Sequence, residues 1–319
     1  MSQVTHLHTP AAHVAVVNGL RGLAALWVCW YHVTGLIQPA ASAFATLGRY
    51  GFMGVQVFFV VSGFVIPHAL HRAHYQLPQF PRFLAKRLLR LHPPYLAVVA
   101  TIALSLWIGR LTSLNATNFT WPQLLAHLAY LNPFLHQPWF LESFWTLAVE
   151  FQYYLSIGLL FRWIARPGWI PAIAIAALSG AASLLLPAGA YLPHHLPFFA
   201  MGIAVFRRLS LKAPLAETLL ILAISALFAQ TAHAWIAATI ALGTALAILF
   251  VPYTNRALDA LGDLSYSLYL THPLSASFAV TLVASTPLAL AACLIGAWPL
   301  YRFVEIPSKR WSARVSYRP

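Results

Sequence analysis

The feature that most constrains this chain is a series of long apolar stretches separated by polar connections. A stretch of about twenty apolar residues is long enough for a helix to cross a bilayer. Ten such stretches can be read, at residues 15–37, 51–70, 91–109, 144–162, 168–186, 192–207, 214–230, 233–252, 264–284 and 286–304. Hydrophobic residues make up 60% of the chain and charged residues only 8%, whereas soluble domains carry about 25% charged residues. The sequence therefore predicts an all-α, polytopic membrane protein with about ten transmembrane helices.

Lysine and arginine residues lie almost entirely on one side of this predicted bundle. If the stretches cross the membrane in turn, all but three of the 19 basic residues fall on the side of the N-terminus. The exceptions are Arg49 and Arg110, on the opposite side, and Arg21, inside the first stretch. Because cytoplasmic loops are enriched in basic residues, both termini are expected in the cytoplasm. This one-sided placement explains the formal charge of +13. The expected partner is therefore the lipid bilayer and not a nucleic acid.

Two connections between the apolar stretches are long. The first, at 71–90, carries basic residues and is expected on the cytoplasmic side. The second, an outer loop at 110–143, is rich in Asn, Trp and Pro and includes Asn115, Asn118 and Trp121. Its tryptophans suit a segment that lies in the membrane interface or, alternatively, one that stacks on a sugar ring.

The rest of the chain indicates no second domain. Since no internal repeat is apparent, residues 1–319 are expected to form a single membrane domain. Residues 2–13 are polar, and no cleavable signal is expected there. Cys29 and Cys293 both lie within apolar stretches, and the 14 histidines are scattered without a zinc-binding spacing. We therefore expect neither a disulfide framework nor a metal site.

The first apolar stretch carries two ionisable residues, Arg21 and His32. Eleven positions on an α-helix end about 20° past three full turns, so both side chains leave the same face, about 16 Å apart along the axis. Each residue also has an ordinary explanation: Arg21 as an anchor at the membrane boundary, and His32 as a hydrogen-bonded core residue. Because ionisable groups inside a span are costly, the pair is a candidate functional site.

Among the six acidic residues, Glu150 lies inside a predicted span. A lone carboxylate there needs a partner or a water-filled cavity. Beside a histidine, it would hold the imidazole in one tautomer and raise its basicity; the alternative is a structural ion pair with an arginine. Asp263 is expected to cap the N-terminus of the ninth span, and Glu217 to interact favourably with a helix dipole.

The segment that leads into the third span is basic and amphipathic. Arg82, Lys86, Arg87 and Arg90 share one helix face, with Phe83 and other apolar residues largely opposite. Such a helix typically lies in the membrane interface, where anionic head groups would satisfy its charges. A second interpretation is that Arg87 and Arg90, one turn apart, form a fork that binds phosphates.

These motifs, in this order, resemble the acyltransferase-3 family of membrane acyltransferases. The matching segments are Gly19-Leu-Arg21 with His32, residues 54–64, Arg87-Leu-Leu-Arg90 with its following Pro-Tyr, residues 145–154, residues 261–273 and Glu305-Ile-Pro307. The resemblance implies ten core helices, an acyl-CoA donor, and transfer of an acyl group, usually acetyl, to a hydroxyl of a cell-surface carbohydrate. It also implies residue roles: His32 matches the essential histidine, Arg21 its paired basic residue, Arg87 and Arg90 the arginines at the coenzyme A end, and Glu150 a functional glutamate.

Two positions depart from the family's pattern. Many members carry a second glutamate where this chain has Phe151, and many carry an aspartate where this chain has Gln56. Any proton handling by carboxylates is then expected of Glu150 alone. The hydrolase-like extracellular domain that is fused to some relatives is also missing from this sequence, so the acceptor is expected to bind to the membrane domain and its outer loops.

The expected reaction follows from the resemblance. His32 would act as the base for the acceptor hydroxyl, Glu150 would orient the imidazole or hold the acceptor, and Arg21 would lie in the donor channel. Direct transfer and an acyl-histidine intermediate are both open. Two other functions are also open: acylation of a small molecule such as an antibiotic or a lipid, and transport by a carrier or flippase.

Overall fold

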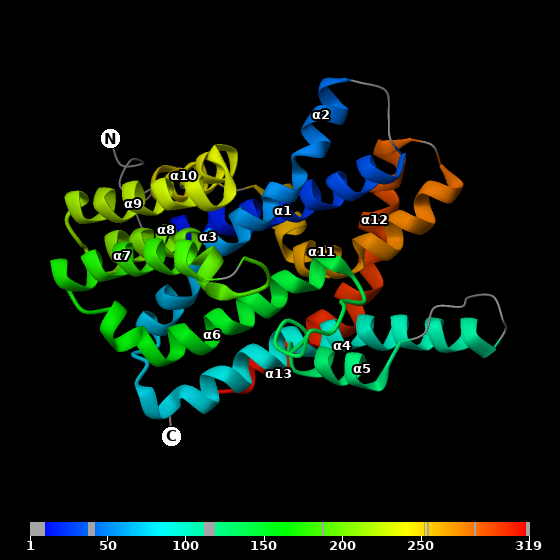
Figure 1. The fold of residues 1–319 in the computed structure, drawn as a ribbon, viewed down its shortest axis with the longest axis horizontal. Coiled ribbons are helices and arrows are strands. Elements are labelled where there is room, and N and C mark those ends of the chain that lie inside the picture. Colours follow the sequence, from blue (N-terminus) through cyan, green and yellow to red (C-terminus); the bar gives the residue numbers. More distant parts are fainter. Residues whose placement is uncertain are drawn as a thin grey trace.

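A computed structural model describes residues 10–37, 42–111, 119–186, 188–251, 253, 255–283 and 285–316. These residues form helices and turns and contain no strand (Figure 1). Asn115 and Asn118 of the predicted outer loop lie outside the described residues. The α-helices are α1 (Pro10–Ile37), α2 (Ala43–Arg49), α3 (Gly54–Arg72), α4 (Phe80–Leu111), α5 (Trp121–Leu128), α6 (Trp145–Ile164), α7 (Trp169–Leu185), α8 (Leu192–Ser210), α9 (Leu215–His233), α10 (Trp235–Phe250), α11 (Arg256–Leu282), α12 (Thr286–Leu300) and α13 (Ile306–Arg314).

Each of the ten predicted spans coincides with a helix, but the helices differ in length and apolarity. Six helical segments of the described chain are long and apolar enough to cross a membrane: Val16–Ile37, Gly51–Arg72, Leu77–Gly109, Glu142–Ile164, Leu215–His233 and Thr286–Arg314. Two further apolar helices, α7 and α10, are shorter. The all-α membrane architecture is thus supported, whereas the number of ten crossings and the side on which the termini lie stay predictions.

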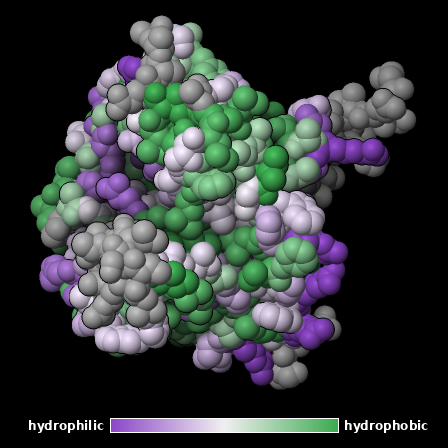
Figure 2. Space-filling model, turned by 90° about the vertical axis from the view of Figure 1, so that its right-hand side faces the viewer, coloured by the Kyte–Doolittle hydropathy of each residue, from purple (hydrophilic) through white to green (hydrophobic). Residues whose placement is uncertain are grey.

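The outer surface of the bundle is largely apolar. On the face in Figure 2, hydrophobic side chains cover most of the area and hydrophilic ones gather towards its margins. Large side chains such as Ile170, Leu185 and Ile295 are 82%, 81% and 74% exposed. In water such a surface would be an aggregation hazard, so its natural environment is lipid.

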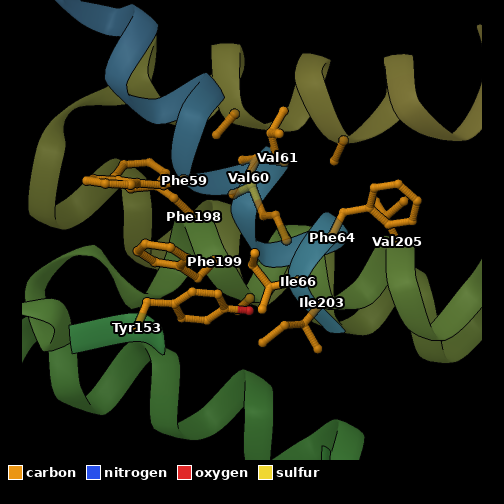
Figure 3. Packing of buried hydrophobic residues seen from close by; sticks show 14 of the residues in the cluster. Phe59, Val60, Val61, Phe64, Ile66, Tyr153, Phe198, Phe199, Ile203 and Val205 are labelled. Atoms are coloured by element: carbon orange, nitrogen blue, oxygen red, sulfur yellow. The ribbon is translucent and has the colours of Figure 1, made fainter. Parts of the chain in front are cut away.

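The core is built on two close helix crossings. In one of them α1 packs against α11, where a Cβ on Gly22 or Gly262 would collide with the facing backbone. In the other, α3 packs against α8, and a Cβ on Gly63 or Gly202 would do the same. Phe59, Phe199 and Tyr153 stack beside this second crossing (Figure 3). Small residues let membrane helices approach closely, and these glycines do so at both crossings.

Substitution of Gly202 by alanine is expected to lower stability by about 1–3 kcal/mol, the usual cost of overpacking a core. The new methyl group would meet Val60 O and the backbone of Gly63. Gly243 in α10 is a matched control, because a Cβ there meets no atom within 4 Å, and alanine is the better helix former by about 1 kcal/mol. Thermal unfolding in detergent should therefore show a lower melting temperature for G202A and an equal or higher one for G243A. An unchanged melting temperature for G202A would contradict the close crossing.

The structure corrects the prediction of a separate amphipathic helix before the third span. Residues of the basic segment and of the span form one continuous helix, α4, which passes through Pro93 and Pro94. The Tyr266 hydroxyl donates a hydrogen bond to Leu91 O at 2.6 Å, next to the prolines. Phe83 is fully buried and lies under the Arg87 guanidinium at 5.6 Å, rather than on the opposite face. The start of α4 is covered on one side by α13, where the Ser312 hydroxyl donates a hydrogen bond to Lys86 O. Other residues of this segment, such as Arg82, are exposed.

The described part of the 110–143 loop contains a short helix, α5, and a set of turns. His127 is fully buried there: its Nε2 accepts a hydrogen bond from Phe140 N at 3.1 Å, and its Nδ1 donates to Gln123 O. Burial lowers the pKa of His127 below its usual range. On the outer side of α5, Trp121, Leu125 and Leu128 form an exposed apolar stripe, which fits the interpretation of an interface-lying segment.

One of the two expected helix-end roles for acidic residues is wrong. Asp263 does not begin a helix, since α11 starts at Arg256 with Asn255 as its N-cap. Glu217 does lie in the first turn of α9, as expected for a favourable interaction with the helix dipole. It is also buried and forms an ion pair with Arg207 at 2.6 Å, a partner that the sequence pattern near a helix start does not reveal.

Candidate active site

An internal cavity gathers four of the five predicted site residues. Arg21 reaches it from α1, Arg87 and Arg90 from α4, and Glu150 from α6. Apolar and hydroxyl side chains of α3 and α11 complete its wall, including Ser62 and Tyr266. Its volume is about 120 Å³. We call it the arginine cavity.

The arginine cavity holds more positive than negative charge. Among the described residues, the two ion pairs join Arg207 to Glu217 and Lys309 to Glu305, so neither Glu150 nor another carboxylate forms an ion pair with the three cavity arginines. The Nε atom of Arg87 is buried without a hydrogen-bond partner, and its guanidinium lies over the rings of Phe83 and Tyr154. A buried hydrogen-bond donor without a partner is costly. The arrangement is therefore suited to an anionic ligand.

Glu150 is held in place by two hydroxyl donors. Ser62 on α3 donates to its Oε1 at 2.9 Å, and Tyr154, one helical turn further along α6, donates to the same atom. Glu150 is thus the negative member of the arginine cavity. The expected contact between Glu150 and the His32 imidazole is not present, because His32 has a different partner and lies in a different cavity.

His32 lines a second, wider cavity with a volume of about 630 Å³. Tyr31, Thr34, Arg49 and Glu142 also line it. Arg49 and Glu142 are exposed, whereas Thr34 is 2% exposed and its hydroxyl has no partner in the described structure. We call this the histidine cavity; its walls combine an imidazole, an aromatic ring, hydroxyls and charges of both signs.

The partner of His32 is a second histidine, His272 of α11. The Nδ1 atom of His32 lies 3.1 Å from His272 Nε2 and 3.0 Å from Val28 O. His272 is fully buried. His272 belongs to the segment 261–273 by which the chain resembles the family. The two histidines are 240 positions apart, so their contact could not be predicted from the sequence.

The two cavities have no lining residue in common. Tyr269 and Thr146 line the arginine cavity and share a hydrogen bond of 2.7 Å. The ring of Tyr269 lies 5.7 Å from the ring of His272, and His272 in turn contacts His32. The shared helix face of Arg21 and His32 therefore leads to two neighbouring chambers rather than to one site. Within the described residues, no group of histidine, cysteine and acidic side chains could hold a metal ion.

Comparison with known proteins connects this geometry to a family. A family model described as an acyltransferase domain matches residues 14–302. The chain is 30% identical over 160 residues to O-acetyltransferase OatA of Staphylococcus aureus, an alignment that covers 46% of this chain and 24% of that protein. It is 28% identical over 172 residues to peptidoglycan O-acetyltransferase OatA of Listeria monocytogenes, covering 49% of this chain and 26% of that protein. No solved structure matches the chain.

These alignments span about a quarter of the length of the two OatA proteins. The family model, in contrast, extends over α1 to α12 and includes every residue of both cavities. The resemblance seen in the motifs is thereby confirmed, and the protein belongs to the acyltransferase-3 family of acyltransferases.

Proposed function

We propose that the protein is an O-acyltransferase of the cell membrane that moves an acetyl group from acetyl-CoA to a hydroxyl of a cell-surface or exported carbohydrate. The observation that carries this proposal is the set of three arginines that line one cavity without a carboxylate partner. The names of the OatA relatives support the acetyl group and the hydroxyl acceptor.

The arginine cavity is proposed to receive the donor. Coenzyme A carries several phosphates, and Arg87 and Arg90 present two guanidinium forks of the kind that bind phosphate oxygens. The buried, unpartnered Nε of Arg87 is a donor that such an oxygen would satisfy. Glu150, with Oε1 occupied by Ser62 and Tyr154, retains an oxygen that can accept a hydrogen bond from an amide N–H of the pantetheine arm.

The histidine cavity is proposed to receive the acceptor. His32 takes the proton of the acceptor hydroxyl while that oxygen attacks the thioester carbonyl carbon; the C–O bond forms, the C–S bond breaks, and the departing thiolate takes up the proton. The exposed charged residues Arg49 and Glu142 at this cavity can hydrogen-bond to sugar hydroxyls. Both termini would lie in the cytoplasm, so that the donor enters from the side where α4 begins.

The thioester has to pass from the arginine cavity towards His32. Tyr269 and Thr146 line the arginine cavity, and the Tyr269 ring lies 5.7 Å from the ring of His272, the partner of His32. We propose that the hydrogen-bonded side chains of Tyr269 and Thr146 move aside when the donor binds. The Tyr269 hydroxyl also donates to Ser143 O at 3.2 Å. These bonds can be exchanged for bonds to the ligand at little net cost.

Addition of acetyl-CoA to the purified protein is expected to raise its melting temperature. A ligand at 100 times its dissociation constant stabilises the folded state by about 2.7 kcal/mol. In the R87Q R90Q variant, two charge-assisted hydrogen-bond donors are lost, each worth about 1.5–3 kcal/mol, so the donor should bind at least roughly a hundredfold more weakly. Thermal unfolding across a titration of acetyl-CoA measures both effects.

The matched control is R82Q, because Arg82 is an exposed arginine of the same helix that does not line the cavity. It should keep the stabilisation by acetyl-CoA. The proposal fails if millimolar acetyl-CoA leaves the melting temperature of the unaltered protein unchanged, as expected for a carrier or flippase, or if R87Q R90Q responds like R82Q. The acceptor is then found by mass spectrometry of surface glycans from cells with and without the protein.

A further inference from the structure

We infer that His272 is a positioning residue that holds His32 in the tautomer required for base catalysis. The inference rests on the proposed function for the role of His32, but the tautomer itself follows from the hydrogen bonds. His272 lines neither cavity and is fully buried, so it is placed to act on His32 and not on a substrate.

The proton positions follow from the carbonyl groups around His272. Its Nδ1 lies 2.8 Å from Tyr269 O and 3.1 Å from Leu268 O. Because a carbonyl oxygen only accepts hydrogen bonds, the Nδ1 of His272 must carry the proton. In a neutral imidazole the other nitrogen is then an acceptor, so Nε2 of His272 presents its lone pair.

That lone pair meets His32. Since His272 Nε2 and Val28 O both face the Nδ1 of His32, and both are acceptors, this Nδ1 is the protonated nitrogen. The Nε2 of a neutral His32 is therefore unprotonated, and it is the nitrogen available to take a proton from an acceptor hydroxyl in the histidine cavity. His272 here supplies the acceptor that an aspartate provides in a serine-protease triad.

Val28 O alone would hold the same tautomer less firmly. In a helix, this carbonyl also accepts the backbone N–H of His32, so the ring shares it with the backbone, just as the ring of His272 shares Leu268 O. An imidazole nitrogen is a more basic acceptor than an amide oxygen. When His32 Nε2 receives a proton, the charge is stabilised through the Nδ1–H bond to His272, whose own Nδ1–H stays fixed by two carbonyls.

Nitrogen NMR of protein labelled with ¹⁵N in its histidine rings tests this without any substrate. The His32 signals are assigned by their loss in H32Q, and they should show a protonated Nδ1 and an unprotonated Nε2. H272L removes the acceptor and should shift part of His32 to the opposite tautomer, whereas H272Q, whose side-chain oxygen can accept, should preserve the original one. H68L is the control, because His68 is a buried histidine of α3 that lines neither cavity and should leave the His32 signals unchanged.

Activity adds a second readout. We expect H272L to lower kcat roughly 10–100-fold with KM for acetyl-CoA unchanged, and H272Q to recover at least part of that loss, since a general base contributes about 10²–10⁴-fold in total. A protonated Nε2 on His32 in the unaltered protein, or an unchanged tautomer in a folded H272L variant, overturns the inference. Normal NMR results in a protein that transfers no acetyl group would instead reject the proposed function and leave the tautomer assignment standing.

Discussion

Replacement of His32 by alanine is expected to abolish measurable acyl transfer while leaving the protein folded. Removal of a positioned general base costs about 10²–10⁴-fold in rate. The fold should tolerate the change because His32 is half-buried at the wall of an open cavity of about 630 Å³, where water can replace the ring. Acetylation of surface glycans, the proposed acceptor, is compared between cells that carry the variant and cells that carry the unaltered protein, and the amount of folded protein in membranes is measured alongside.

The variant H32Q separates chemistry from packing at this position. Glutamine preserves much of the volume of the imidazole and can hydrogen-bond, but it cannot take up a proton at neutral pH. It should be as inactive as H32A and should bind acetyl-CoA like the unaltered protein, since His32 does not line the arginine cavity. Acylation by either variant at the original rate would remove His32 from the mechanism.

Replacement of Arg207 by methionine is expected to cost about 3–5 kcal/mol of folding free energy, the usual penalty for breaking a buried ion pair. Arg207 is 1% exposed and its Nε donates to Glu217 Oε1 at 2.6 Å. The two other nitrogens donate to Ile164 O, Arg166 O and Gly168 O. One guanidinium thus joins α8 to the connection between α6 and α7 and to the start of α9, and its loss leaves the buried carboxylate of Glu217 unpaired.

Arg208 provides the comparison, because it is the next residue of α8 and donates only to Ala213 O at 2.9 Å. Thermal unfolding should show a large fall in melting temperature for R207M and a change within about 1 kcal/mol for R208M. The double variant R207M E217L should recover part of the loss, since buried ion pairs can often be replaced by apolar pairs. Equal melting temperatures for R207M and R208M would show that the ion pair contributes little to stability.

The residues of the candidate site could be recognised in the sequence because they are rare. Arg21, His32 and Glu150 interrupt long apolar stretches, and an ionisable residue in such a context needs a reason. The grouping of these residues was less predictable. Glu150 was expected beside His32, yet it lies with the arginines, and His272 takes its place 240 positions away in the chain. Helix periodicity places residues on a face of their own helix, but it does not say which other helix covers that face.

The pattern of apolar stretches was sufficient to predict an all-α membrane protein and a helix of the described chain at each of the ten stretches, because lipid requires backbone hydrogen bonds to close within a segment. Tertiary packing decided which helices cross. The sequence shows Gly202 and Gly262, but only the folded structure shows that Gly202 lies against the backbone of α3 and Gly262 against the backbone of α1. The continuity of α4 through two prolines and the burial of Arg207 also depend on contacts between distant segments. Local hydrophobicity therefore specifies the helices, whereas the division of the site into an arginine cavity and a histidine cavity arises from how those helices pack.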